Sequence, residues 1–194
     1  MSRLCVFCGS SAGHRTVFAD EARRLGTIMA QGGIGLVYGG GNVGLMGVLA
    51  HSVLQQGGEV IGVIPRALQA RELALQETTQ LHVVGTMHER KALMAELADG
   101  FVALPGGFGT CDELFEILTW AQLGLHDKPV ALLNVDNFFT PLLDWLRSTV
   151  EAGFVKSSNL QLLQILSDPN AVIDLLRQPK RKEPEPKWIG REDL

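Results

Sequence analysis

The chain has 194 residues, of which 46% are hydrophobic and 20% are charged, a composition typical of one globular domain with a substantial core. Its formal charge of −4 and the lack of any apolar run near the roughly 18 residues of a membrane span favour neither a nucleic-acid partner nor a membrane partner. Three cysteines, an odd number, argue against a disulfide framework, and the start MSRLCVFCGSS turns polar too soon for a secretory signal. We therefore expect a cytoplasmic protein.

Short apolar runs alternate with helical patterns along the chain. In chain order, strands are predicted at 4–8, 34–38, 59–64, 81–85, 101–104, 129–135 and 163–167, and helices at 15–31, 44–56, 87–98, from about Thr110, at 138–151 and at 169–177. Continuous Val/Ile/Leu runs separated by helices indicate a parallel sheet covered on both faces. The sequence predicts an α/β fold, a Rossmann-like, doubly wound parallel sheet of about seven strands in three α/β/α layers.

The composition changes near the C-terminus. Residues 1–178 are predicted to form a single domain, and 66–80 is a polar, less regular stretch within it. Residues 179–194 combine proline with mixed charge and cannot bury enough apolar surface to order themselves, so we expect a flexible charged tail.

Cys5 and Cys8 form a C-x-x-C pattern, which raises the possibility of redox or metal chemistry. Both lie in a predicted strand, where positions three apart point to opposite faces. The chain has no second Cys/His pair with zinc spacing. We therefore interpret them as buried structural cysteines and expect no metal site.

Three strand-to-helix turns are rich in glycine and hydroxyl groups: 8–11, 39–47 and 105–110. In an open parallel sheet, ligands bind beyond the carboxyl ends of the strands, where such turns gather. Glycine lets the backbone approach a ligand closely, and the N–H groups that start a helix bind anions. A single such loop is as often a plain tight turn, but three at one sheet edge predict a pocket for a phosphorylated small molecule.

The second turn contains a formal G-x-G-x-x-G at positions 39, 41 and 44. A dinucleotide site would need an acidic residue near the end of the next strand, to bind the ribose diol. That strand instead ends at Pro65 and Arg66, and Glu59 stands at its other end. NAD is therefore disfavoured, and a mononucleotide remains open.

Two further segments carry chemistry. In TMHERKALM (86–94), Arg90 would be a fixed cation near the ligand edge, whereas a lone His88 is more often structural and Glu89 is interpreted as solvent-facing. In ALPGGFGTCDELF, Thr110 and Glu113 form the T-x-x-E of a capping box, so that Glu113 is either a helix cap or a catalytic carboxylate.

These blocks resemble the LOG (Lonely Guy) family of cytokinin riboside 5′-monophosphate phosphoribohydrolases. PGGFGTCDE (105–113) fits the family signature P-G-G-x-G-T-x-x-E, and MHERK (87–91), GGGNVGLMG (39–47) and CGSS (8–11) fit its other blocks. The resemblance extends from about residue 3 to 177. Relatives often carry the label lysine decarboxylase, which the sequence does not support, because no lysine stands in a pyridoxal-phosphate context.

The resemblance implies hydrolysis of the N-glycosidic bond of an N6-modified AMP, or of AMP itself, with Arg90 and Glu113 as the catalytic residues. Glu113 would stabilise the ribosyl cation, hold the hydroxyls or activate water, and Arg90 would stabilise the leaving base or position the substrate. The implied substrate-binding residues are Ser10, Gly40, Gly41, Met87, Lys91, Gly106, Gly107, Gly109 and Thr110. No metal or cofactor is implied, and the family forms homodimers with the pocket near the subunit interface.

Two alternatives stay open. One is an AMP nucleosidase without a cytokinin role, which the sequence barely distinguishes from an enzyme that releases cytokinins. The other is a nucleotide-binding protein without turnover, which would explain the glycine loops but not the joint presence of Arg90 and Glu113.

Overall fold

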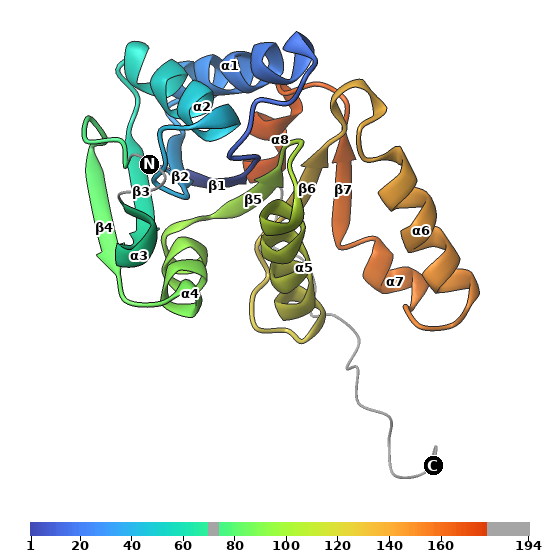
Figure 1. The fold of residues 1–194 in the computed structure, drawn as a ribbon. Coiled ribbons are helices and arrows are strands. Elements are labelled where there is room, and N and C mark those ends of the chain that lie inside the picture. The colour runs from blue at the N-terminus through green and yellow to red at the C-terminus, as the bar shows by residue number, and fades with distance from the viewer. Residues whose placement is uncertain (70–73, 178–194) are drawn as a thin grey trace.

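The computed structural model describes residues 1–69 and 74–177, and over these the chain forms one seven-stranded parallel sheet with helices on both faces (Figure 1). The strands are β1 (Arg3–Phe7), β2 (Gly35–Tyr38), β3 (Val60–Pro65), β4 (Gln80–Val84), β5 (Gly100–Ala103), β6 (Val130–Leu133) and β7 (Leu163–Leu166). The helices are α1 (Thr16–Gln31), α2 (Gly44–Gln55), α3 (Arg66–Gln69), α4 (Met87–Leu97), α5 (Phe108–Gln122), α6 (Thr140–Glu151), α7 (Ser157–Leu160) and α8 (Ala171–Arg177), with a 3-10 turn η1 (Val135–Asn137). The Rossmann-like α/β prediction is confirmed. The predicted tail at 179–194 lies outside the described residues.

The strand periodicity sorts side chains into two cores. Along β1, Leu4, Val6 and the following Cys8 face a core that α1, α2 and α8 complete. Cys5 and Phe7 face the opposite core, under α4, α5 and α6. The two cysteines therefore point to opposite faces, as predicted, and both are buried free thiols. Burial raises the pKa of both thiols, so they stay protonated near neutral pH.

The central strands are buried on both faces because both faces carry helices: every residue of β3 and of β5 is buried. The edge strands are more open, and Val83 in β4 and Ile165 in β7 are exposed. The irregular stretch predicted at 66–80 contains the short α3 and an isolated bridge between Gly41 and Ala74. No helix in the described ranges is long and apolar enough to cross a membrane.

The strand order β4-β3-β2-β1-β5-β6-β7 reverses direction between β1 and β5. The chain moves outward one way through β2, β3 and β4, and the other way through β6 and β7. Connections leave β1 and β5 toward opposite faces, so a crevice opens beyond their carboxyl ends. Two of the three glycine-rich turns follow these two strands.

Candidate active site

The three glycine-rich turns are hydrogen-bonded to one another at the carboxyl edge of the sheet. Gly9 donates its N–H to the carbonyl of Pro105 over 3.1 Å, and the N–H of Leu45 donates to the carbonyl of Gly9 over 3.0 Å. The turn after β1 is thereby held between the other two. This confirms that turns far apart in the sequence share one edge.

A cavity of about 180 Å³ opens at this junction. Its lining residues are Val6, Cys8, Gly9, Ser10, Gly39, Met46, Arg90, Gly107, Phe108, Gly109, Thr110 and Glu113. The side chains of Arg90, Thr110 and Glu113 are buried, whereas Ser10 and the 107–109 segment are exposed at the rim. The cavity therefore has a charged, largely enclosed floor and a backbone-rich mouth.

An ion pair between Arg90 and Glu113 forms that floor. Arg90 Nη1 lies 3.0 Å from Glu113 Oε1, and the two side chains are only 8% and 9% exposed. Arg90 Nε also donates to the carbonyl of Val63 over 3.1 Å, which fixes the plane of the guanidinium. Removal from water strengthens such a pair and makes it costly to leave either charge without a partner. The geometry brings together the two residues singled out on different segments of the sequence.

The start of α5 differs from the predicted capping box. The helix begins at Phe108 with Gly107 as its N-cap, and no side chain caps it. Thr110 is thus the third residue inside the helix, and Glu113 turns toward Arg90, so of the two interpretations of T-x-x-E the capping box is wrong. The physical reason is that the glycine turn lets the helix start two residues earlier. Its first residues line the cavity, and the N–H groups that start a helix are of the kind that can bind an anion.

The capping box lies on α4 instead. Thr86 is the N-cap, and its side chain accepts from the N–H of Glu89 over 3.1 Å. The carboxylate of Glu89 accepts in turn from the N–H of Gly85 over 2.8 Å. Glu89 is exposed, as predicted, but it also anchors the helix that presents Arg90.

Comparison with known proteins connects this site to a family. A family model described as "Possible lysine decarboxylase" matches residues 46–176. The cytokinin riboside 5'-monophosphate phosphoribohydrolase LOG1 of Arabidopsis thaliana is 48% identical over 169 residues, which cover 87% of this chain and 78% of the relative. The probable cytokinin riboside 5'-monophosphate phosphoribohydrolase LOGL1 of Oryza sativa subsp. japonica is 52% identical over 176 residues, which cover 91% of this chain and 78% of the relative. The chain belongs to the LOG family.

Solved structures agree on the fold. The molybdenum cofactor binding protein from Rippkaea orientalis superposes with a TM-score of 0.69 at 23% identity, and it covers 91% of this chain and 95% of its own. The structure of TM1055 gives a TM-score of 0.68 at 20% identity, with 92% and 100% covered. At these identities the likeness concerns the architecture alone.

The decarboxylase description of the family model has no counterpart among the lysines that the structure describes. Lys91 pairs through Nζ with Asp112 and Glu116, both at 3.1 Å. Burial alone would lower the pKa of Lys91, but the hydrogen bonds that its ammonium donates to Glu116 and Asp112 outweigh burial and raise the pKa. Lys128 donates to the carbonyl of Ala95. None of the lysines in the described ranges lines the cavity of the Arg90–Glu113 pair.

The predicted substrate-binding residues separate into two groups. Ser10, Gly107, Gly109 and Thr110 line the cavity together with the ion pair. The others lie elsewhere in this structure: Gly40, Gly41, Met87 and Lys91 are not among its lining residues, and Gly106 lines a neighbouring cavity. The Gly40 carbonyl accepts from the N–H of Leu75, so this part of the loop serves the fold.

Sequence reasoning missed several lining residues. Val6 is an ordinary core residue in the sequence, and Cys8 and Met46 lie within the turns at 8–11 and 39–47 but have apolar or structural side chains, to which the sequence gives no role in a site. Phe108 occupies the unspecified position of the LOG signature, so the motif itself does not predict a role for it. The available signal was that its neighbours on both sides, Gly107 and Gly109, belong to the signature.

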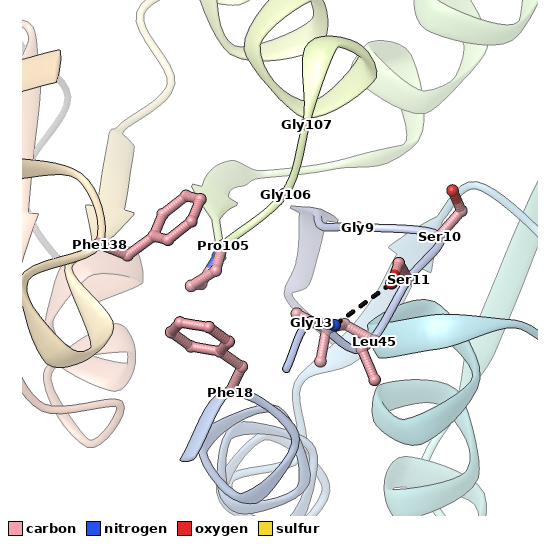
Figure 2. A pocket seen from close by; sticks show the side chains of 11 residues that line it. Gly9, Ser10, Ser11, Gly13, Phe18, Leu45, Pro105, Gly106, Gly107 and Phe138 are labelled. Carbon is pink, nitrogen blue, oxygen red and sulfur yellow. Dashed lines mark hydrogen bonds between the residues drawn. The ribbon is translucent and has the colours of Figure 1, made fainter. Parts of the chain in front are cut away.

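A second cavity of about 280 Å³ adjoins the first and shares Gly9, Ser10 and Gly107 with it. Figure 2 shows Phe18, Pro105 and Phe138 gathered on one side of it and the loop from Gly9 to Gly13 on the other. The rings of Phe18 and Phe138 meet edge to face with centroids 5.6 Å apart. This cavity holds no charged side chain, so the chemistry belongs to the first.

Proposed function

We propose that the chain hydrolyses the N-glycosidic bond of adenosine 5′-monophosphate or an N6-modified form of it, releasing the free base and ribose 5-phosphate. The named relatives are cytokinin riboside 5'-monophosphate phosphoribohydrolases. The observation that carries the proposal is the buried Arg90–Glu113 pair beside the open N-terminus of α5. An anion site and a carboxylate in one cavity suit a phosphorylated sugar.

The start of α5 supports the placement of the substrate. The N–H groups of the 107–110 segment, with the Ser10 and Thr110 hydroxyls, would hold the 5′-phosphate. Glu113 follows Phe108 by five residues, about 7.5 Å along the helix at 1.5 Å per residue. That length is comparable to the distance from the phosphate to the anomeric carbon of ribose. The carboxylate would therefore lie beside the ribose when the phosphate is seated.

The pair can act on both products of bond cleavage. As the bond to the base breaks, positive charge develops on the ribose and negative charge on the base. The Glu113 carboxylate would stabilise the cation or take a proton from the attacking water, and the Arg90 guanidinium would stabilise the departing base. Water adds its hydroxyl to the anomeric carbon, and its proton ends on the base. Both groups are fixed before the substrate arrives, so little reorganisation accompanies the reaction.

The ion pair also separates the hydrolase from a binding protein without turnover. A binding protein would need the glycine turns, whereas a buried charge pair adds nothing to phosphate binding and costs desolvation. An AMP nucleosidase without a cytokinin role uses the same chemistry and differs only in the base that it prefers.

We propose in addition a homodimer in the cytoplasm, with the pocket near the subunit interface. Large apolar side chains exposed just beyond the C-terminal end of α5 and on α6 support an interface: Leu123, Leu125 and Trp145. Three free cysteines support a reducing compartment. Sedimentation equilibrium of the purified protein tests the dimer.

The deciding experiment incubates the protein with AMP and with isopentenyladenosine 5′-monophosphate and measures free base by chromatography. Base release from either supports the proposal, and a large preference for the prenylated nucleotide supports the cytokinin role. Tight nucleotide binding without release of base from either would refute hydrolysis.

A further inference from the structure

Lys91 is a charged residue that lies next to the Arg90–Glu113 pair but outside its cavity. It follows Arg90 directly on α4, and its Nζ lies 3.1 Å from Asp112 Oδ2 and 3.1 Å from Glu116 Oε2, both on α5. Its side chain is only 11% exposed. Because Lys91 does not line the cavity, any effect that it has on a substrate there must pass through its neighbours.

Two sets of ion pairs therefore connect α4 and α5, which cover the same face of the sheet (Figure 1). The inner set is the buried contact of Arg90 with Glu113. The outer set is formed by Lys91 with Asp112 and Glu116. Asp112 and Glu116 are four residues apart and so lie on one face of α5, with Glu113 beside them. A shift of α4 that breaks the outer contacts would also separate the inner pair.

The start of α4 has little apolar surface to fix its position. Between 87 and 91, Arg90 is the one buried residue, and the three residues before it are exposed. The residues of α4 that pack into the core begin at Leu93. A buried charge gives little net stability by itself, so polar contacts have to hold this end of the helix. Lys91 supplies two of them.

We propose that Lys91 is a positioning residue, whose ion pairs with Asp112 and Glu116 keep α4 at the distance from α5 where Arg90 meets Glu113. This inference rests on the proposed hydrolysis, which requires the inner pair to be in place before the substrate arrives. A displacement of about 1 Å in such a site can lower the rate about 10²-fold. Lys91 then supports the residues that act on the substrate and does not itself bind it.

A charge exchange separates positioning from substrate contact. Lys91→Glu brings three carboxylates together and should lower kcat about 10²-fold. KM for AMP and inhibition by ribose 5-phosphate should change less than about 3-fold, because Lys91 does not line the cavity. Combining Lys91→Glu with Asp112→Lys restores an ion pair between the helices and should return kcat to within about 3-fold of wild type. A lysine that contacts the substrate would not be rescued in this way.

Arg24 provides a matched control, since it also bridges two carboxylates. Its guanidinium lies 3.5 Å from Glu21 and 3.1 Å from Asp168, which ties α1 to the turn after β7. Arg24→Gln should keep the wild-type kcat, whereas Lys91→Gln should lower kcat about 10-fold or more. Each variant is assayed well below its own melting temperature, so a loss of kcat in Lys91→Gln alone reports position and not global unfolding.

Hydrogen exchange gives a second measurement that needs no substrate. Arg90 Nε donates to the carbonyl of Val63, so its proton should exchange slowly with water. The signal is identified in ¹H–¹⁵N spectra by its absence in Arg90→Lys. We expect exchange about 10-fold faster or more in Lys91→Glu, and a rate close to wild type in the charge-exchange variant. If Lys91→Glu does not fold, Lys91→Gln takes its place in both measurements.

Unchanged kcat and unchanged exchange in the single Lys91 variants would overturn the positioning role. So would a charge-exchange variant that recovers neither. A raised KM with weaker inhibition by ribose 5-phosphate would instead assign Lys91 to substrate contact. If wild type releases no base, the proposed hydrolysis fails separately, and the exchange rate of the Arg90 Nε proton alone decides whether Lys91 positions Arg90.

Discussion

Gly39 leaves the space that the guanidinium of Arg90 occupies. A Cβ atom at position 39 would lie 2.1 Å from Arg90 Nη2 and 3.1 Å from the sulfur of Met46. The loop after β2 therefore leaves room for the side chain of Arg90. A second glycine of its G-x-G-x-x-G pattern also faces protein atoms: Gly44 has φ +58°, and a Cβ there would lie 2.3 Å from the carbonyl carbon of Ser10. The pattern that suggests a dinucleotide is explained by packing.

Gly39→Ala is expected to reduce kcat/KM by about 10²-fold or more, because Arg90 must leave the carbonyl of Val63 or the carboxylate of Glu113 to admit the methyl group. The melting temperature should fall by a few degrees, as a buried pair is disturbed. Steady-state kinetics and thermal unfolding of the same preparation measure both effects.

A double variant provides the control for this prediction. Since Arg90→Ala removes the atoms that clash, adding Gly39→Ala to it should cost little further stability, whereas Gly39→Ala alone costs more. If the two losses add fully, the methyl group acts through another contact and the account of Gly39 is wrong.

We expect the buried Arg90–Glu113 pair to lower the stability of the fold and to be needed for the proposed hydrolysis. The double substitution Arg90→Met with Glu113→Leu should keep or raise the melting temperature, since apolar residues of similar volume often replace buried ion pairs without loss. Base release should fall by about 10²- to 10⁴-fold. Glu113→Gln should be similarly inactive but less stable than the double variant, because it leaves the buried guanidinium without a carboxylate.

Thermal unfolding separates these variants, and base release by each measures catalysis. Retained activity in Glu113→Gln would show that the carboxylate is not needed. A double variant that unfolds at a lower temperature than Glu113→Gln would show that the pair stabilises the fold.

The sheet could be predicted because its signal is local. Runs such as 60–64, within the strand predicted at 59–64, are apolar at every position, and a strand that is buried on both faces has that pattern for a physical reason. The start of α5 could not be predicted in the same way. Thr110 and Glu113 satisfy the capping-box pattern as well as Thr86 and Glu89 do, and only the tertiary contact of Glu113 with Arg90 decides between them.

The candidate site shows the same division. The residues of the ion pair came from resemblance to a family, and the three turns came from glycine content. Their 3.0 Å contact depends on how α4 lies against α5, and the space that Gly39 leaves for Arg90 depends on how α4 lies against the turn after β2. Pairwise packing between segments far apart in the chain is not encoded in local periodicity.

Gly106→Ala and Gly109→Ala are expected to have opposite effects on stability. A Cβ at 106 would lie 2.0 Å from Thr110 Oγ1 and 2.9 Å from the N atom of Gly9, so the variant must open the junction of two turns. A Cβ at 109 meets nothing within 4 Å, and alanine favours a helix by about 1 kcal/mol over glycine. Gly109→Ala should therefore melt higher than wild type and Gly106→Ala lower.

Activity adds a second measurement for this pair of variants. Because Gly109 borders the proposed phosphate position, its alanine variant should show a raised KM for AMP despite its greater stability. An unchanged KM would place the phosphate away from the 107–110 segment.

Glu59→Gln is expected to destabilise the protein in a pH-dependent way. Glu59 accepts from Arg3 Nε over 2.8 Å, and this hydrogen bond holds the pKa of Glu59 below its ordinary value of 4.5. A carboxylate whose pKa is lower in the folded state adds stability above the unfolded pKa and loses it as the pH falls through the folded pKa. Wild type should exceed the variant by up to about 1 kcal/mol at pH 7, and the two should converge below pH 4.5.

Denaturant unfolding of both proteins between pH 3 and pH 7, in steps of about half a unit, measures this difference. Asp144→Asn is the matched control, because Asp144 and its partner Arg147 are 62% and 57% exposed and such a pair contributes little at any pH. Protonation removes the charge of Glu59 in wild type, so a difference in unfolding free energy that is due to this charge must disappear at low pH. If the difference between wild type and Glu59→Gln instead stays constant down to pH 3, the loss comes from packing.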